Sequence, residues 1–237
     1  ASFKPYKEIT GGGLNIIPKT FTLESYKTLF FTDENFLRWI FNSFYLCTII
    51  TAANVLINSM AGYSLARINF RGKQVVFYVI LATIMVPGQI LLIPNYLIIK
   101  QLGLLNTYNA VIFPAAVNAS YIFMMRQFYI NFPRVVEEAA EIDGLGRWGV
   151  FFRIAMPLAK PSIATMAVFT FLGAWNSFLG PKLYLADPKK YTLTVGIQTM
   201  MSRYSGITQW DQVMAASVIS LIPNLIIYIN LNRYFIQ

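Results

Sequence analysis

The sequence contains no histidine and only one cysteine in 237 residues. Without histidine, the chain has no imidazole for acid–base catalysis or metal ligation. The single Cys47 excludes an internal disulfide and a thiolate cluster, and its place in an apolar run predicts a small buried side chain. A phosphate-binding glycine-rich loop that ends in Lys followed by Ser or Thr is also missing. These absences predict a protein with no catalytic site, metal site or bound cofactor of its own.

Charged residues are scarce in this chain. They make up 12% of it, against about 25% in a typical soluble domain. Hydrophobic residues reach 56% and the mean hydropathy is +0.53, a composition typical of a membrane protein. The net charge of +9 does not indicate nucleic acid, because the basic residues stand at the ends of apolar runs instead of clustering with aromatic residues. We therefore expect membrane lipid around the chain and no nucleic-acid partner.

The few charges delimit long uncharged stretches. No charged residue falls between Arg38 and Arg67, and four further gaps are also long enough for a membrane helix. A bilayer core about 30 Å thick requires roughly 20 apolar residues per helix, so each gap can hold one crossing. Pro114 interrupts the third gap, which a membrane helix tolerates where neighbours bond the freed carbonyl. The sequence predicts an all-α integral membrane protein with five membrane helices, near residues 41–66, 75–98, 107–126, 158–180 and 212–234.

Lysine and arginine residues give the expected orientation, because cytoplasmic connections carry an excess of them. The basic connections after the first and third helices are expected inside, together with the C-terminus. The segments expected outside are residues 1–38, 99–106 and 181–211. The chain then consists of an external N-terminal segment (1–38) and a transmembrane domain (39–237) with a cytoplasmic loop at 127–157. Since five spans leave Ala1 outside, we expect a sixth, N-terminal membrane helix to precede this sequence.

The segment PRVVEEAAEIDGLGRWGVFFRIAMP, residues 133–157, is charged and amphipathic between uncharged runs. Pro133 suits the first turn of a helix and Gly144 suits a helix end. Helical spacing places two apolar stripes on either side of that glycine. The first stripe is Val135, Ala139 and Ile142, and the second is Trp148, Phe151, Phe152 and Ala155. The pattern predicts two short helices joined at Gly144.

Glu138-Ala139-Ala140, followed by Gly144, Ile154 and Pro157, matches the EAA signature. In this respect the chain resembles the membrane subunits of bacterial ABC importers, in which this cytoplasmic loop docks on an ATP-hydrolysing subunit. The resemblance implies a type I ABC importer transmembrane domain that is itself not an enzyme, with ATP and Mg bound by the partner. It also implies a set of docking residues: Glu138, Ala139, Ala140, Asp143, Gly144, Ile154 and Pro157.

Further stretches resemble the carbohydrate-importing branch of these permeases, in particular its maltose-type second permease. They include NSMAGYSLAR (58–67), WNSF (175–178) and YTLTVG (191–196). The resemblance implies a sugar or oligosaccharide as cargo in the bacterial inner membrane. It also implies a second permease in a heterodimer, two ATP-binding subunits and an extracytoplasmic solute-binding protein. Ser177 departs from the family, where many members carry glutamate, and this leaves the identity of the solute open.

Polar residues inside membrane spans are costly and often functional. The candidates for the solute pathway are Asn54, Asn58, Asn118, Trp175 and Asn176. For each of them, hydrogen bonding between helices is the alternative role. In maltose-type permeases the long external loop reaches into the binding protein, which suggests contacts by Tyr184, Tyr191, Tyr204 and Trp210. An amphipathic helix on the membrane surface is the alternative for that loop.

Two other classes of transporter stay open at this stage. The first is an importer permease for a different solute, such as an amino acid, phosphate or a polyol. The second is an ATP-independent secondary transporter, which usually places ionisable residues within its spans. The predicted spans here contain none, which favours a transporter driven by an external ATPase.

Overall fold

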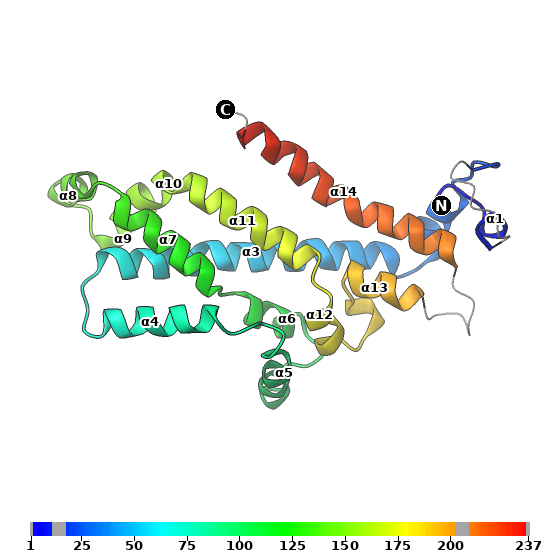
Figure 1. The fold of residues 1–237 in the computed structure, drawn as a ribbon, viewed down its shortest axis with the longest axis horizontal. Coiled ribbons are helices and arrows are strands. Elements are labelled where there is room, and N and C mark those ends of the chain that lie inside the picture. The colour runs from blue at the N-terminus through cyan, green and yellow to red at the C-terminus, as the bar shows by residue number, and fades with distance from the viewer. Residues whose placement is uncertain (1, 11–17, 202–208, 236–237) are drawn as a thin grey trace. The chain divides into compact units, whose positions relative to one another are not determined.

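The computed structural model describes residues 2–10, 18–201 and 209–235, and every regular element within them is helical (Figure 1). The chain divides into two compact units. The first consists of residues 1–45, 105–108 and 175–237, and the second of residues 46–104 and 109–174. The long helix α3 (Phe36–Arg67) begins in the first unit and continues into the second. The absence of strands among the described residues agrees with the all-α fold expected from the sequence.

The second unit holds most of α3 and the helices of the charged segment. Its other elements are α4 (Lys73–Ile84), α5 (Leu92–Gln101), α6 (Tyr108–Ala115), α7 (Ala119–Asn131), α8 (Arg134–Ile142), α9 (Arg147–Val150), the π-helical turn η2 (Phe151–Ala155), α10 (Met156–Leu158) and α11 (Lys160–Trp175).

The first unit holds both ends of the described chain. Its elements, beside the start of α3, are α1 (Tyr6–Thr10), α2 (Glu24–Lys27), the π-helical turn η1 (Thr28–Thr32), α12 (Leu179–Tyr184), the 3₁₀ turn η3 (Pro188–Lys190), α13 (Leu193–Met200) and α14 (Trp210–Phe235).

Two predicted membrane helices form as single helices. Both α3 and α14 are long and apolar enough to cross a membrane. The 32 residues of α3 extend for about 48 Å at 1.5 Å per residue, whereas the hydrocarbon core is about 30 Å thick. At least one end of α3 therefore lies beyond the hydrocarbon, unless the helix is strongly tilted.

The predicted helix over 75–98 is wrong as a single helix. Helix α4 ends at Ile84 and α5 begins at Leu92. Pro87 and Gly88 lie between them, and a proline without an N–H donor followed by a flexible glycine interrupts a helix. A long stretch without charged residues shows that a segment is apolar. It does not show that the segment forms one unbroken helix.

The third predicted span also differs from a straight helix, because α6 and α7 meet at a bend of 43° just after Pro114. The fourth, predicted over 158–180, forms as α11 from Lys160 to Trp175, after a bend of 77° that separates it from the 147–158 segment. Among the described residues, two helices are long enough to cross alone, and up to four crossings result if each bent pair counts as one. The number of five spans stays a prediction.

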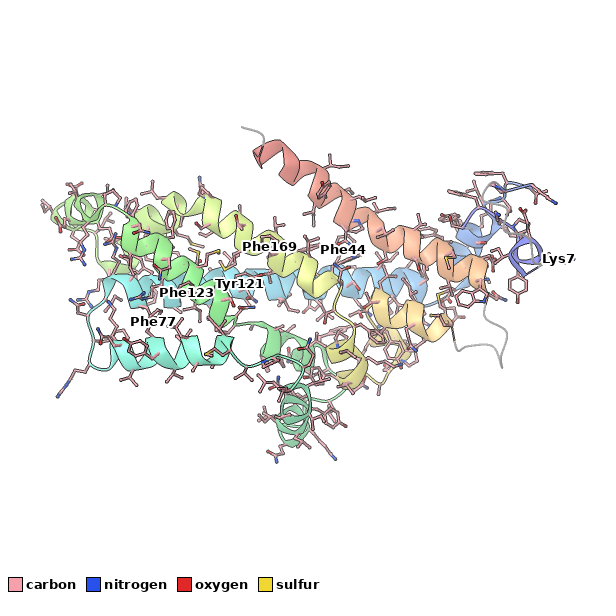
Figure 2. All side chains as sticks on the ribbon, in the orientation of Figure 1. Lys7, Phe44, Phe77, Tyr121, Phe123 and Phe169 are labelled. Atoms are coloured by element: carbon pink, nitrogen blue, oxygen red, sulfur yellow. The ribbon has the colours of Figure 1, made fainter. Side chains whose placement is uncertain are left out.

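Close helix packing organises the second unit. A Cβ atom added at the buried Gly62 on α3 would lie 2.6 Å from Met125 Cβ and 2.9 Å from Arg126 N on α7. On the same helix α7, Phe123 stacks on Phe77 of α4 with 6.3 Å between ring centroids (Figure 2). The Arg126 guanidinium lies 3.8 Å from the centroid of the Phe77 ring, within reach of a cation–π interaction. Helix α7 is thus fixed between α3 and α4.

In the first unit, Asn106 ties together segments that were expected outside the membrane. Its φ of 59° is left-handed, a conformation that asparagine adopts more readily than most residues. Its N–H donates to the Tyr184 carbonyl (2.7 Å), and its side-chain oxygen accepts from the N–H groups of Ala186 and Asp187. Trp39 Nε1, at the start of α3, donates to the Pro188 carbonyl (2.8 Å). These contacts join Asn106 and the start of α3 to residues 184–188 within the first unit.

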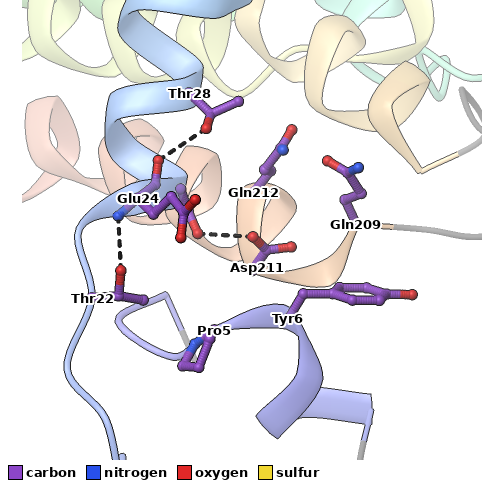
Figure 3. A pocket seen from close by; sticks show the side chains of 9 residues that line it. Pro5, Tyr6, Thr22, Glu24, Thr28, Gln209, Asp211 and Gln212 are labelled. Carbon is purple, nitrogen blue, oxygen red and sulfur yellow. Dashed lines mark hydrogen bonds between the residues drawn. The ribbon is translucent and has the colours of Figure 1, made fainter.

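A pocket of about 280 Å³ lies between the N-terminal segment and the start of α14 (Figure 3). The Ser25 hydroxyl donates to Asp211 Oδ2 across it at 2.9 Å. This bond joins a second pair of segments that were expected outside. The residues that line the pocket are Pro5, Tyr6, Thr22, Glu24, Ser25, Thr28, Gln209, Asp211 and Gln212.

Candidate functional site

The charged segment folds as two short helical arms. Helix α8 follows Pro133 and ends at Ile142, and the N–H of Leu145 closes the turn by donating to the Ala140 carbonyl (3.0 Å). Gly144 has a φ of 87°, in the left-handed region that favours glycine. The second arm then starts with α9. The prediction of two short helices joined at Gly144 is confirmed.

The first arm, α8, turns its apolar side chains outward. Val135 is 72% exposed and Ile142 is 86% exposed, and Ala139 between them is exposed as well. The inward face instead carries Glu137 and Ala140, which are buried. A soluble surface helix normally shows the opposite arrangement. Such an outward apolar face on a charged segment indicates a surface that another protein covers.

Glu137 is held by Arg67, the last residue of α3. Arg67 Nε lies 3.3 Å from Glu137 Oε1, and the two side chains are only 7% and 11% exposed. Burial raises the pKa of the Glu137 carboxyl, while the neighbouring Arg67 guanidinium lowers it. The sequence alone predicted no role in the site for either residue. Two buried positions three apart, Glu137 and Ala140, share one face of a helix, but their spacing does not say that this face is the inner one.

The second arm does not keep its expected single apolar stripe. Phe151 and Ala155 are buried, at 2% and 1% exposed, whereas Trp148 is 66% exposed and Phe152 is 46% exposed. Trp148 and Phe152 are four residues apart on one edge of the stripe and Phe151 and Ala155 on the other, and only the second edge faces the core. A π-helical turn spans residues 151–155. The exposed Trp148 and Phe152 rings stack with centroids 6.2 Å apart. Part of the predicted stripe therefore belongs to the core and part to the surface.

The residues of the EAA signature also include both exposed and buried positions. Glu138, Ala139, Asp143, Gly144 and Pro157 are exposed, Ile154 is partly buried, and Ala140 is buried. The exposed members come from both arms.

Replacing Gly144 by alanine should loosen this turn by about 1 kcal/mol, because a Cβ disfavours the left-handed conformation. No atom lies within 4 Å of the Cβ position, so the cost is conformational and not steric. Hydrogen exchange of the α8 amides should therefore be about fivefold faster in Gly144→Ala. Gly144→Asn is the control, since asparagine tolerates φ above zero and should exchange nearly as the parent. Equal exchange rates in the parent and the alanine variant would contradict this account.

Three of the predicted pathway residues lie at the break between α6 and α7. Asn54 Nδ2 donates to the Ala115 carbonyl (2.6 Å), and Asn58 Nδ2 donates to Asn54 Oδ1 (2.9 Å). Asn58 Oδ1 in turn accepts from the N–H of Asn118 (3.2 Å), whose own side chain caps α7 by accepting from the Ser120 N–H. These amides bond the backbone groups that the helix break frees. A solute would have to displace a backbone partner to reach them.

Trp175 and Asn176 lie together at the end of α11. Trp175 is 2% exposed, its Nε1 donates to the Ser220 carbonyl (3.0 Å), and its ring lies 4.8 Å from that of Phe44. Asn176 is exposed and exchanges hydrogen bonds with Asn224 of α14. Of the pair, Asn176 offers the more accessible polar group.

The expected external loop at 181–211 contains ordered helices, namely part of α12, then η3 and α13. Tyr184 is 5% exposed, so its ring has little surface for a partner in this structure. Tyr191 is partly buried, with its hydroxyl donating to the Ala186 carbonyl, and Trp210 is 38% exposed. Tyr204 lies outside the described residues. Trp210 is therefore the most accessible of the three described contact candidates.

The described residues contain no group of three or more His, Cys, Asp or Glu side chains that could hold a metal ion. The arrangement at the charged segment consists of a surface and a buried ion pair. It can bind and position a partner helix or groove.

Comparison with known proteins gives matches over most of the chain. The family model described as "Binding-protein-dependent transport system inner membrane component" matches residues 58–237. The arabinooligosaccharides transport system permease protein AraQ of Halalkalibacterium halodurans is 36% identical over 238 residues, covering 100% of this chain and 85% of that protein. The polygalacturonan/rhamnogalacturonan transport system permease protein YtcP of Bacillus subtilis is 34% identical, covering 99% of this chain and 86% of YtcP.

Two further similarities are to a permease named for a different solute and to a transporter of known structure. The sn-glycerol-3-phosphate transport system permease protein UgpE of Yersinia enterocolitica is 33% identical, covering 84% of this chain and 70% of UgpE. A crystal structure of a bacterial ABC transporter involved in the import of the acidic polysaccharide alginate has a chain that superposes with a TM-score of 0.89 at 23% identity. The superposition covers 99% of this chain and 87% of that one, and shows a shared fold.

Proposed function

Because this chain belongs to the family of binding-protein-dependent transport system inner membrane components, we propose that it forms half of the membrane pathway of a sugar or oligosaccharide importer. Its cytoplasmic segment 133–157 docks on an ATP-hydrolysing subunit. The observation that carries the docking role is the outward apolar face of α8, on which Val135 and Ile142 are 72% and 86% exposed.

The names of the relatives support a carbohydrate as cargo. AraQ and YtcP are named for transport systems of arabinooligosaccharides and of polygalacturonan or rhamnogalacturonan, and both match nearly the whole chain. The compounds in these names are all chains of sugar units, which favours an oligosaccharide over a single small solute. The cargo of this chain is therefore an oligosaccharide delivered by a solute-binding protein.

The chemistry of the segment suits a mechanical role. The small, exposed side chain of Ala139 lets a partner backbone approach α8 closely, and the Glu138 carboxylate is exposed to meet a cation on the partner. ATP closes the two ATPase subunits, and the docked arms transmit this closure to the membrane helices. The pathway then alternates between inward- and outward-facing states, with the ATPase pair as the element that biases the equilibrium.

The complete transporter contains a second, different permease, two ATP-binding subunits and an extracytoplasmic binding protein. The basic connections and the docking segment lie in the cytoplasm with the C-terminus, and residues 1–38 and 181–211 lie outside. The domain limits expected from the sequence, with an external N-terminal segment before residue 39, follow from the same orientation. The contacts of Asn106 and the Ser25–Asp211 bond support this sidedness.

An importer for glycerol phosphate is the second candidate, since UgpE is named for sn-glycerol-3-phosphate. Glycerol 3-phosphate is a single small phosphorylated polyol, whereas an oligosaccharide is a chain of several sugar units. Stimulation of ATP hydrolysis by each solute distinguishes the two cargoes.

The test begins with purification of the tagged full-length chain from its own host, with its co-purifying subunits identified by mass spectrometry. We expect an ATPase, a second permease and a solute-binding protein. In proteoliposomes, an arabino-oligosaccharide or galacturonan oligomer together with the binding protein should stimulate ATP hydrolysis, and glycerol 3-phosphate should not. Stimulation by glycerol 3-phosphate alone would favour the second candidate. Absence of an ATPase from the complex would overturn the docking role.

A further inference from the structure

The backbone on either side of helix α8 does little to fix the orientation of α8 in the second unit. It is only nine residues long, and it lies between Pro133 and the left-handed Gly144. Proline donates no N–H, and the chain reverses its handedness at the glycine. Side-chain contacts must therefore fix the orientation of α8.

The Arg67 side chain reaches α8 from the end of α3. Arg67 Nη2 donates to the Phe132 carbonyl, just before α8, and Arg67 Nε lies 3.3 Å from Glu137 Oε1 on the inner face of α8. The Arg67 guanidinium carbon also lies 6.0 Å from the centroid of the Phe132 ring. A cation at the last residue of α3 is favoured by the helix dipole, so the guanidinium is stabilised where it stands.

Burial separates this ion pair from an ordinary surface pair. The side chains are 7% and 11% exposed, so water screens their attraction little. Buried pairs usually add little stability over apolar side chains of the same volume, because removing the charges from water is costly. Nε and Oε1 are near each other but not aligned as a hydrogen bond. A gain in stability therefore does not explain why these two charges are buried together. A role in orienting α8 does explain it.

The second arm is attached to the same turn of α3. Tyr63 precedes Arg67 by four residues and so lies on the same face of the helix. Its ring lies 5.1 Å from that of Phe151, which is 2% exposed at the start of the second arm. Tyr63 and Phe151 belong to one buried cluster with Met125 and Tyr129 of α7. Both arms of the docking segment are therefore tied to one face of the last turns of α3.

We propose that Arg67 and Glu137 form a charged clamp that locks the docking helix α8 to the end of α3, so that the two move as one body. The clamp rests on the proposed docking role of α8, and its residues position the docking surface without touching the ATPase. Without the clamp, a partner would still bind α8, but movement of α8 would no longer be passed to α3.

The first test measures the orientation of α8 independently of transport. In the full transporter, with Cys47 replaced by alanine, spin labels at Phe70→Cys and Glu141→Cys report the distance between the loop after α3 and α8. Both positions are exposed, and Cys47 is the only native cysteine. Arg67→Gln and Glu137→Gln should each broaden the distance distribution about twofold or more, since a two-state contact is lost. The exposed Arg71→Gln serves as the matched control and should leave it unchanged.

The second test measures coupling in the unlabelled transporter as solute moved per ATP hydrolysed. Arg67→Gln and Glu137→Gln should each lower this ratio about tenfold while the ATPase subunit still co-purifies. The charge swap Arg67→Glu with Glu137→Arg should recover most of the loss, because the pair is restored with its signs exchanged. Arg71→Gln, outside the docking segment, should behave as the parent.

The outcomes separate the clamp from the docking role. Unchanged distance distributions in both single variants, or a charge swap no better than the single variants in an intact complex, overturn the clamp. If Arg67→Gln prevents folding, the distances and coupling of Glu137→Gln and of the swap decide the question. If Ile142→Asp leaves the ATPase bound, the docking role itself fails, whatever the clamp variants do.

Discussion

Replacing Ile142 by aspartate should remove the ATPase subunit from the purified complex and lower solute uptake about 30-fold or more, the effect of losing a central interface residue worth 2 kcal/mol or more. Ile142 is 86% exposed on the outward face of α8, where we propose that the ATPase covers it. A carboxylate buried in that interface without a partner cation adds a desolvation cost to the lost apolar contact. Co-purification of the ATPase and uptake of radiolabelled solute measure the two effects.

Ile142→Leu is the matched control, since it conserves volume and apolarity and should keep the ATPase bound. Membrane insertion of both variants should equal that of the parent, because the side chain makes little contact within the chain. Normal uptake by the aspartate variant would place the docking surface elsewhere on the permease.

Replacing Gly62 by alanine should prevent assembly of a stable second unit. The new Cβ would lie 2.6 Å from Met125 Cβ and 2.9 Å from Arg126 N, and a backbone nitrogen cannot rotate away. Overpacking in a tight core costs typically 1–3 kcal/mol, and we expect about 3 kcal/mol here because α7 itself must shift. The yield of monodisperse complex and its thermal midpoint measure the loss.

Gly173 on α11 offers the same substitution without the clash, since no atom lies within 4 Å of its Cβ position. Gly173→Ala should leave the thermal midpoint unchanged or raise it, because alanine is favoured over glycine in a helix by about 1 kcal/mol. If both alanine variants are equally stable, close approach of α3 and α7 is not what Gly62 provides.

The sequence predicted the apolar helices better than their breaks. The gaps between charges located α3 and α14 closely, because a membrane helix excludes charge over its whole length. The same rule failed over 75–98, where Pro87 and Gly88 divide one apolar stretch into α4 and α5. Apolarity is compatible with a broken helix if neighbours satisfy the freed carbonyls. Asn54, 61 residues earlier in the chain, donates a hydrogen bond to the carbonyl of Ala115 in this way.

The docking segment was predictable in outline and not in orientation. Helix-start and helix-stop residues located its two arms around Gly144, because these residues act locally. Which face of α8 points inward depends on Arg67, 70 residues earlier in the chain. Periodicity finds a stripe but cannot tell a core from an interface, and the EAA signature points to Glu138 without indicating that the neighbouring Glu137 is buried. Periodicity likewise joins Trp148 and Phe152 to Phe151 and Ala155 in one stripe and does not show that only the second pair is buried.

The outward apolar face of α8 has a consequence before the transporter is assembled. A newly inserted permease without its ATPase exposes Val135, Ile142 and Trp148 to the cytosol. Chaperones and proteases recognise such exposed apolar surface, and the lifetime of a membrane subunit then depends on how soon it is covered. Cells that make this permease in excess of its ATPase should clear the surplus. The surface that we propose docks on the ATPase thereby sets the ratio in which the subunits accumulate.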